Sequence, residues 1–131
     1  MSSSRSPLQI LIVDPHAESV ELLRLLFEQH GYEVAVEGSI HALLESNPSP
    51  PPDILVVTSP APTPAFADLL RAVRARTPKP LGIVVMGDLY AGDEALRDVA
   101  PFIEGYVRRP VIVTELLAMV DDLARRLAAP A

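Results

Sequence analysis

The 131-residue chain contains no cysteine and no tryptophan, and aromatic residues make up only 5% of it. The absence of cysteine excludes a disulfide framework, thiolate metal ligands and thiol redox chemistry. No apolar run in the sequence approaches the ~18 residues of a membrane-spanning helix. Acidic residues outnumber basic ones by 17 to 11, which gives a net charge of -6. We therefore expect neither nucleic acid nor a membrane surface as a partner.

The chain has the length and composition of one globular domain. Hydrophobic residues make up 49% and charged residues 21% of it, as in proteins with a packed apolar core. The serine-rich segment 1–7 lacks the apolar stretch of a secretory signal. We predict a disordered tail over 1–7, a single domain over 8–129 and a cytoplasmic location. The sequence suits a complete protein and one domain of a longer protein equally.

Continuous apolar runs alternate with segments of helical periodicity. The runs are 8–13, 54–57 and 81–86, and weaker strand candidates are 33–37 and 105–107. Runs that are apolar throughout, rather than at every second residue, are typical of strands buried on both faces of a parallel sheet. Strand and helix alternate five times, which predicts an α/β fold with helices on both faces of the sheet.

The helical segments carry their apolar residues on one side. In the first, these residues are Val20, Leu22, Leu23, Leu26 and Phe27. In the last, they are Val113, Leu116, Leu117, Val120, Leu123, Ala124 and Leu127. Between them, Ser39 is expected to cap a short helix. A fourth helix over about 93–100 should end before Pro101, because proline interrupts the backbone hydrogen bonding of a helix.

Four residues directly follow predicted strands: Asp14, Thr58, Gly87 and Arg109. In open α/β sheets, ligands bind beyond the carboxyl ends of the strands, so these four positions are the first to consider as a functional site.

Five segments of the chain resemble the receiver domains of bacterial response regulators. They are Ile10–Asp14, His30–Val34, Pro52–Val57, Gly105–Pro110 and Thr114–Leu117, and their spacing is similar to that of the family over 8–127. The resemblance implies a flavodoxin-like (βα)5 fold with a doubly wound parallel sheet of order 2-1-3-4-5. It also implies phosphoryl transfer from a phosphohistidine to an aspartate of the domain itself.

In that family, two acidic residues after the first strand hold Mg²⁺. Asp14 matches the first of them, and Pro15 replaces the second. Because Mg²⁺ requires nearly octahedral oxygen coordination, a lone carboxylate implies weak metal binding at best. Asp14 followed by Pro15 also fits the N-cap and first residue of the next helix, and both interpretations stay open here.

The residue that accepts the phosphoryl group in the family is replaced by Thr58. A hydroxyl is mostly protonated at neutral pH and needs a neighbouring base to attack, and we expect no base at the matching positions. Asp53 precedes its strand and should lie at the opposite end of the sheet. The resemblance therefore implies that conventional phosphorylation is lost.

The remaining family positions are also changed. Gly87 replaces the hydroxyl residue of the switch, whereas Tyr106 keeps the aromatic position, for which packing is the simpler interpretation. Arg109 replaces the lysine and keeps its charge, although a planar guanidinium differs from an ammonium. We expect Arg109 to pair with Asp14, and its bond to Pro110 to be a cis peptide as in the family.

The resemblance with a changed site predicts a degenerate receiver, or pseudo-receiver, in two-component phosphorelay signalling. We expect it to act by protein–protein interaction without phosphorylation, with no enzymatic activity and no cofactor beyond weak Mg²⁺ at Asp14. Expected partners are a kinase, another receiver or an effector domain. A homodimer through the face formed by 92–127, which includes Glu94, Arg97 and Tyr106, is also expected.

Two alternatives remain. The first is a small-ligand sensor that uses the strand-end pocket of a flavodoxin-like fold. The segment Asp14–Ser19 resembles the D-x-H-x-x-G loop of cobalamin-binding domains, but Ser19 stands at the glycine position, and His16 is more simply a solvated residue at the start of a helix. The second is modification of Thr58 by a Ser/Thr kinase, which would add negative charge where the family carries its phosphate.

Overall fold

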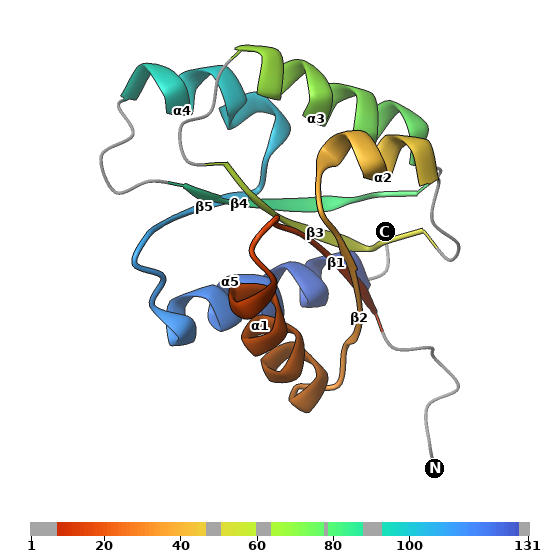
Figure 1. Cartoon of the computed structure of the whole chain (residues 1–131), viewed down its shortest axis with the longest axis vertical. Coiled ribbons are helices and arrows are strands. Elements are labelled where there is room, and N and C mark those ends of the chain that lie inside the picture. Colours follow the sequence, from red (N-terminus) through yellow and green to blue (C-terminus); the bar gives the residue numbers. More distant parts are fainter. Residues whose placement is uncertain (1–7, 47–50, 60–63, 78, 88–92, 129–131) are drawn as a thin grey trace.

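The computed structural model describes residues 8–46, 51–59, 64–77, 79–87 and 93–128. The predicted tail over 1–7 and residue 129 lie outside the described residues. Strands and helices alternate along the chain as the sequence predicts (Figure 1). The elements are β1 (Gln9–Val13), α1 (Ala17–Gln29), β2 (Glu33–Glu37), α2 (Ile40–Ser46), β3 (Ile54–Thr58), α3 (Pro64–Arg76), β4 (Gly82–Gly87), α4 (Asp93–Val99), a 3-10 turn (Ala100–Phe102), β5 (Gly105–Arg108) and α5 (Val113–Ala128).

All strand pairs in the sheet are parallel, and the strand order is β2-β1-β3-β4-β5. Figure 1 shows α1 and α5 on one face of the sheet and α2, α3 and α4 on the other. This is the flavodoxin-like, doubly wound fold that the resemblance implies, and the prediction of the fold is confirmed.

The continuous apolar runs are explained by two cores, one on each face of the sheet. Successive strand residues point to opposite faces. Ile54 and Val56 therefore pack with α1 and α5, whereas Leu55 and Val57 pack with the helices of the other face. All four side chains are at most 1% exposed. The edge strand β2 is more exposed, because one side of it has no neighbouring strand, and its sequence signal is correspondingly weaker.

Helix ends follow local sequence signals. The Ser39 hydroxyl accepts a hydrogen bond from the Ala42 N–H at 3.1 Å, as predicted for the cap of α2. Gly31 has a φ of 91° just after α1, a conformation that glycine adopts at little cost, and it turns the chain back toward β2. The fourth helix ends at Val99, one residue earlier than predicted, because Pro101 belongs to the following 3-10 turn.

One residue of the predicted apolar face of α1 lies in solvent. Leu22 is 67% exposed, whereas Leu23 and Phe27 are buried against the sheet.

In the part of the chain that the structure describes, no helix is both long and apolar enough to cross a membrane.

Candidate functional site

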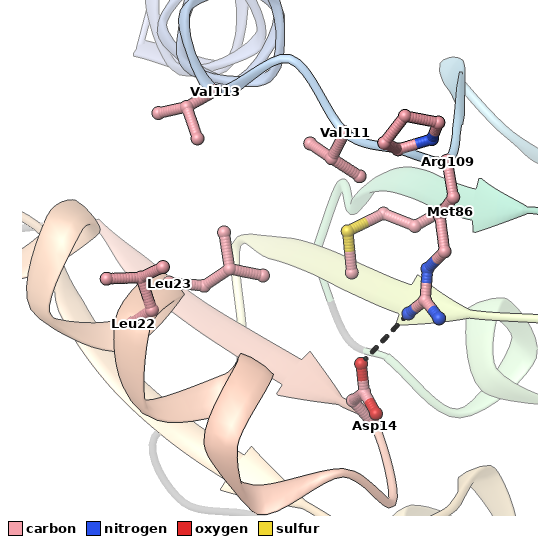
Figure 2. Close-up of a pocket in the computed structure, with 8 residues that line it drawn as sticks. Asp14, Leu22, Leu23, Met86, Arg109, Val111 and Val113 are labelled. Carbon is pink, nitrogen blue, oxygen red and sulfur yellow. Dashed lines mark hydrogen bonds and ion pairs between the residues drawn. The ribbon is translucent and has the colours of Figure 1, made fainter.

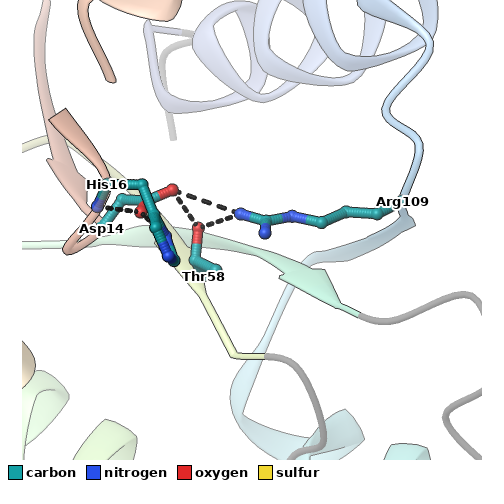
Figure 3. Close-up of polar contacts among 4 residues, drawn as sticks. All are labelled: Asp14, His16, Thr58 and Arg109. Atoms are coloured by element: carbon teal, nitrogen blue, oxygen red, sulfur yellow. Dashed lines mark hydrogen bonds and ion pairs between the residues drawn. The ribbon is translucent and has the colours of Figure 1, made fainter. Parts of the chain in front are cut away.

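Three polar side chains meet at the carboxyl ends of the strands (Figure 3). Asp14 follows β1, Thr58 is the last residue of β3, and Arg109 follows β5. Because Val13 is opposite Val57 in the register, the residues that follow them, Asp14 and Thr58, are also neighbours. Asp53 lies at the other end of the sheet, where its carboxylate accepts a hydrogen bond from the Gln9 N–H at 2.7 Å.

The Asp14 carboxylate is the centre of this cluster, and its side chain is fully buried. Its Oδ1 accepts a hydrogen bond from the backbone N–H of His16 at 2.8 Å and contacts the His16 Nδ1 at 3.1 Å. Its Oδ2 accepts hydrogen bonds from the Thr58 hydroxyl at 2.7 Å and from Arg109 Nη2 at 3.2 Å. Both carboxylate oxygens are therefore engaged within the protein.

The hydrogen bonds keep Asp14 ionised although it is buried. Burial alone would raise the pKa of the carboxyl, because it disfavours the charged form. The hydrogen bonds from His16 and Thr58, together with the positive charge of Arg109, outweigh burial and hold the pKa of Asp14 below its ordinary value.

The Thr58 hydroxyl is held from both sides. It donates to Asp14 Oδ2 and accepts a hydrogen bond from Arg109 Nη2 at 3.0 Å. The two hydrogens of Nη2 thus serve Asp14 and Thr58, and the three side chains form a closed ring of contacts. We refer to Asp14, Thr58 and Arg109 as the strand-end ring.

The expectation that no base lies near Thr58 is wrong. Asp14 is within hydrogen-bonding distance of the hydroxyl because β1 and β3 are neighbours in the sheet. However, a carboxylate whose pKa is lowered takes up a proton poorly. Its oxygens are also fully engaged with other donors, so the arrangement fixes the hydroxyl in place and does little to activate it.

The N-cap interpretation of Asp14 and Pro15 is also wrong. α1 begins at Ala17, and the residue before it, His16, is its N-cap. Asp14 instead accepts the backbone N–H two residues further on, which is an Asx-type turn. The turn brings the His16 ring to Asp14, a contact that the interpretation of His16 as a merely solvated residue missed. The His16 side chain is nevertheless 68% exposed.

Gly87 and Tyr106 fit together closely. A Cβ atom on Gly87 would overlap the hydroxyl oxygen and Cζ of Tyr106 and lie 3.0 Å from its Cε2. The ring therefore fills the space that any side chain at position 87 would need. Tyr106 also packs against the core on the side of α2, α3 and α4. Both positions were singled out from the sequence, but their mutual dependence was not predicted.

Arg109 lies at the start of the segment that joins β5 to α5. Its N–H donates to the carbonyl oxygen of Gly87 at 2.8 Å, and its bond to Pro110 is a cis peptide, as expected. The pairing of Arg109 with Asp14, also expected, is present at 3.2 Å. The charge of Arg109 is therefore compensated within the protein.

The strand-end ring does not suit Mg²⁺. Within the described residues, no group of three or more His, Cys, Asp or Glu side chains is arranged to hold a metal ion. Asp14 offers the single carboxylate, and its oxygens are already bound to donors. The Arg109 guanidinium, 3.2 Å from Asp14, places a positive charge next to where a cation would sit.

A pocket opens beside the ring, between α1 and the segment that joins β5 to α5 (Figure 2). Its walls include Leu22 and Leu23 of α1, Met86 of β4, and Val111 and Val113. A strand-end pocket was the alternative considered from the sequence, but its apolar wall on α1 was not expected. The exposed position of Leu22 was the missing information, since its spacing alone placed it with core residues.

No family model and no curated protein matches the chain. Solved structures do match it. The receiver domain of the TMAO respiratory system response regulator TorR is 27% identical, with a TM-score of 0.76 over 92% of this chain and 99% of that one. A two-component response regulator from Clostridium difficile is 18% identical, with a TM-score of 0.78 over 93% and 99%.

A putative pilus assembly-related protein from Burkholderia pseudomallei is likewise 18% identical, with a TM-score of 0.75 over 100% of this chain and 99% of that one. The structural neighbours of the chain thus include response-regulator receiver domains, and the chain has the CheY-like fold of such domains.

Proposed function

We propose that this chain is a pseudo-receiver, which acts in two-component signal transduction by binding a protein partner without being phosphorylated. The strand-end ring carries the proposal. A hydroxyl, Thr58, stands where the resemblance places the acceptor carboxylate, and it is held by Asp14 on one side and Arg109 on the other. Acyl phosphate formation requires a carboxylate at this position, and Thr58 supplies none.

The ring also supports a domain that does not switch between an unphosphorylated and a phosphorylated conformation. The buried negative charge of Asp14 is balanced by Arg109 inside the protein, so no phosphoryl group is needed to neutralise the cation. Gly87 lacks the hydroxyl that would follow a phosphate, and the Tyr106 ring already occupies the adjoining space. The proposal includes no enzymatic activity and no bound cofactor, and it keeps the cytoplasmic location predicted from the sequence.

The binding surface that we propose is the face formed by α4, β5 and α5, of which the structure describes 93–127. It carries Glu94 and Arg97, both exposed, and Ile112, which is 54% exposed. A hollow of about 510 Å³ lies on it, lined by Tyr106, Val107, Arg108, Arg109, Pro110, Ile112, Glu115 and Met119. An exposed aliphatic side chain among charges of both signs is suited to a protein interface.

Partner capture tests this proposal. Wild-type chain, Ile112→Asp and the control Val36→Asp would be immobilised and exposed to lysate, with and without acetyl phosphate and Mg²⁺. Val36 is also exposed, at 42%, but lies on β2 at the opposite edge of the sheet. We expect the same proteins on wild type and Val36→Asp, fewer on Ile112→Asp, and no effect of acetyl phosphate.

Two results would contradict the proposal: binding that requires acetyl phosphate, or binding that Ile112→Asp leaves unchanged. Light scattering on the purified variants would measure their molar mass in solution and show whether the chain forms a homodimer. If the partner is a second copy, wild type and Val36→Asp should be dimers and Ile112→Asp a monomer.

A further inference from the structure

The pocket beside the strand-end ring has the construction of a small-ligand site. Its volume is about 290 Å³, near the lower end of the range for small-molecule pockets. Met86 and Leu23 are buried in its floor and wall, whereas Leu22 and Val113, at 67% and 38% exposed, stand at its rim. Figure 2 shows these side chains on both sides of an open space that ends at Arg109 and Asp14.

Among the residues that the structure describes, the polar end of the pocket offers the donors of Arg109 and no carboxylate with a free oxygen. Asp14 is fully buried and engages both oxygens, so it has no capacity for a ligand. Arg109 is 36% exposed in its side chain and uses only Nη2 in the ring. Among the described residues, its Nε–H and Nη1 hydrogens have no acceptor. A guanidinium with open donors recognises an anionic oxygen.

The charge balance indicates which anion fits. Asp14 already compensates the single positive charge of Arg109, so a ligand head group must share this cation with a carboxylate. A head group with one negative charge suffers less repulsion from Asp14 than a phosphate with nearly two. The apolar walls favour an apolar remainder of the ligand, and a flexible aliphatic chain is the simplest group of this kind.

We infer that this pocket binds a small aliphatic carboxylate, with its head group at Arg109 and its chain between α1 and the segment that joins β5 to α5. A chain of roughly six to eight carbons suits a pocket of this size class. The bound chain would cover the exposed side of Leu22. The pocket shares Arg109 and Pro110 with the hollow on the face of α4, β5 and α5, whereas its apolar wall on α1 lies outside that face.

Amide chemical shifts of the whole chain, labelled with nitrogen-15, test the inference. The protein would be titrated with butanoate, hexanoate and octanoate, and with 1-hexanol, below the concentrations at which these compounds self-associate. We expect shifts at Asp14, Leu22, Arg109 and 111–113, and affinity that rises about fourfold for each methylene group buried. Hexanoate should bind about tenfold more tightly than 1-hexanol, because both partners are charged only in the carboxylate–guanidinium hydrogen bond.

Two variants on the same helix provide a matched comparison. Leu22→Asn alters the pocket rim, whereas Leu25→Asn alters a leucine that is 46% exposed and does not line the pocket. Both side chains are exposed on the surface of α1, so both variants should fold. We expect Leu22→Asn to weaken hexanoate binding about fivefold or more, because apolar contact is lost, and Leu25→Asn to leave it unchanged.

Arg109→Gln adds a test of the head group: it should abolish the preference for hexanoate over 1-hexanol while the dependence on chain length remains. If this variant fails to fold, the comparison of Leu22→Asn with Leu25→Asn still tests whether hexanoate binds in this pocket. Three results would overturn the inference: no saturable shifts, equal affinity for the acid and the alcohol, or equal effects of Leu22→Asn and Leu25→Asn. None of them would affect the partner-capture result, so the two proposals fail separately.

Discussion

Replacing Gly87 with alanine would place a methyl group where the Tyr106 phenol lies. The new Cβ would overlap the hydroxyl oxygen and Cζ of Tyr106. These atoms are at the far end of a side chain, so the ring can leave by rotation while the sheet stays in place. Gly87 does not have a positive φ, and its backbone should therefore tolerate alanine. The close approach of Tyr106 is the remaining reason for glycine at this position.

The expected free energies follow from this geometry. In the wild-type background, Gly87→Ala should destabilise the fold by about 1–3 kcal/mol, the usual cost of an overpacked site. In a Tyr106→Ala background, the same change should be neutral or stabilising by up to about 1 kcal/mol, since glycine in a strand costs conformational entropy. The predicted coupling between the two positions is therefore about 1–4 kcal/mol, which overlaps the usual range of about 0.5–3 kcal/mol for residues in contact.

Urea unfolding of the four proteins in this cycle would measure the coupling. The ring protons of Tyr106 in NMR spectra would show whether the side chain moves in Gly87→Ala. If Gly87→Ala has the same free-energy cost with and without the Tyr106 ring, the mutual fit of these two residues is not what requires glycine, and the reasoning is refuted.

The strand-end ring and the hydrogen bond from Tyr32 to Asp121 of α5 give three further predictions. Thr58→Val should lower the free energy of unfolding in urea by about 1.5–3 kcal/mol, because buried Asp14 loses a donor, whereas Thr58→Ser should cost less. Folding lowers the pKa of Asp14, so its contribution to the free energy of unfolding is present above the ordinary pKa and is lost as pH falls below about 4. Asp14→Asn should remove this part of the dependence of stability on pH. Tyr32 donates a hydrogen bond to Asp121. Burial of the phenol raises its pKa most, and the hydrogen bond to the Asp121 carboxylate raises it further. The difference in phenolate absorbance between wild type and Tyr32→Phe should therefore appear only well above about pH 10, and equal titration of both proteins near that pH would contradict it.

The fold was accessible from the sequence because its strongest signals are local. A strand covered on both faces must be apolar at consecutive residues, and 54–57 and 81–86 show this plainly. Helix 113–128 has one apolar stripe that packs on the sheet. The edge strands gave weaker signals, since each has one side without a neighbouring strand.

The site was only partly accessible. The residues that follow the strands could be selected because strand ends define the site in this architecture. The contact between Asp14 and Thr58 depends on strand register, and the fit of Tyr106 to Gly87 depends on a side-chain rotamer. Neither is written in the periodicity of a single segment. The same holds for Leu22, because helical spacing places it with the core although the structure leaves it in solvent.

The intact mass of the chain after incubation with acetyl phosphate and Mg²⁺ tests the central claim most directly. A receiver domain known to be phosphorylated would be treated in parallel to show that the conditions are sufficient. We predict an unchanged mass, because Thr58 is held by Asp14 and Arg109 and no acceptor carboxylate stands in its place. A single phosphoryl adduct that maps to Thr58 or Asp14 would contradict the account and show that the strand-end ring still accepts phosphate.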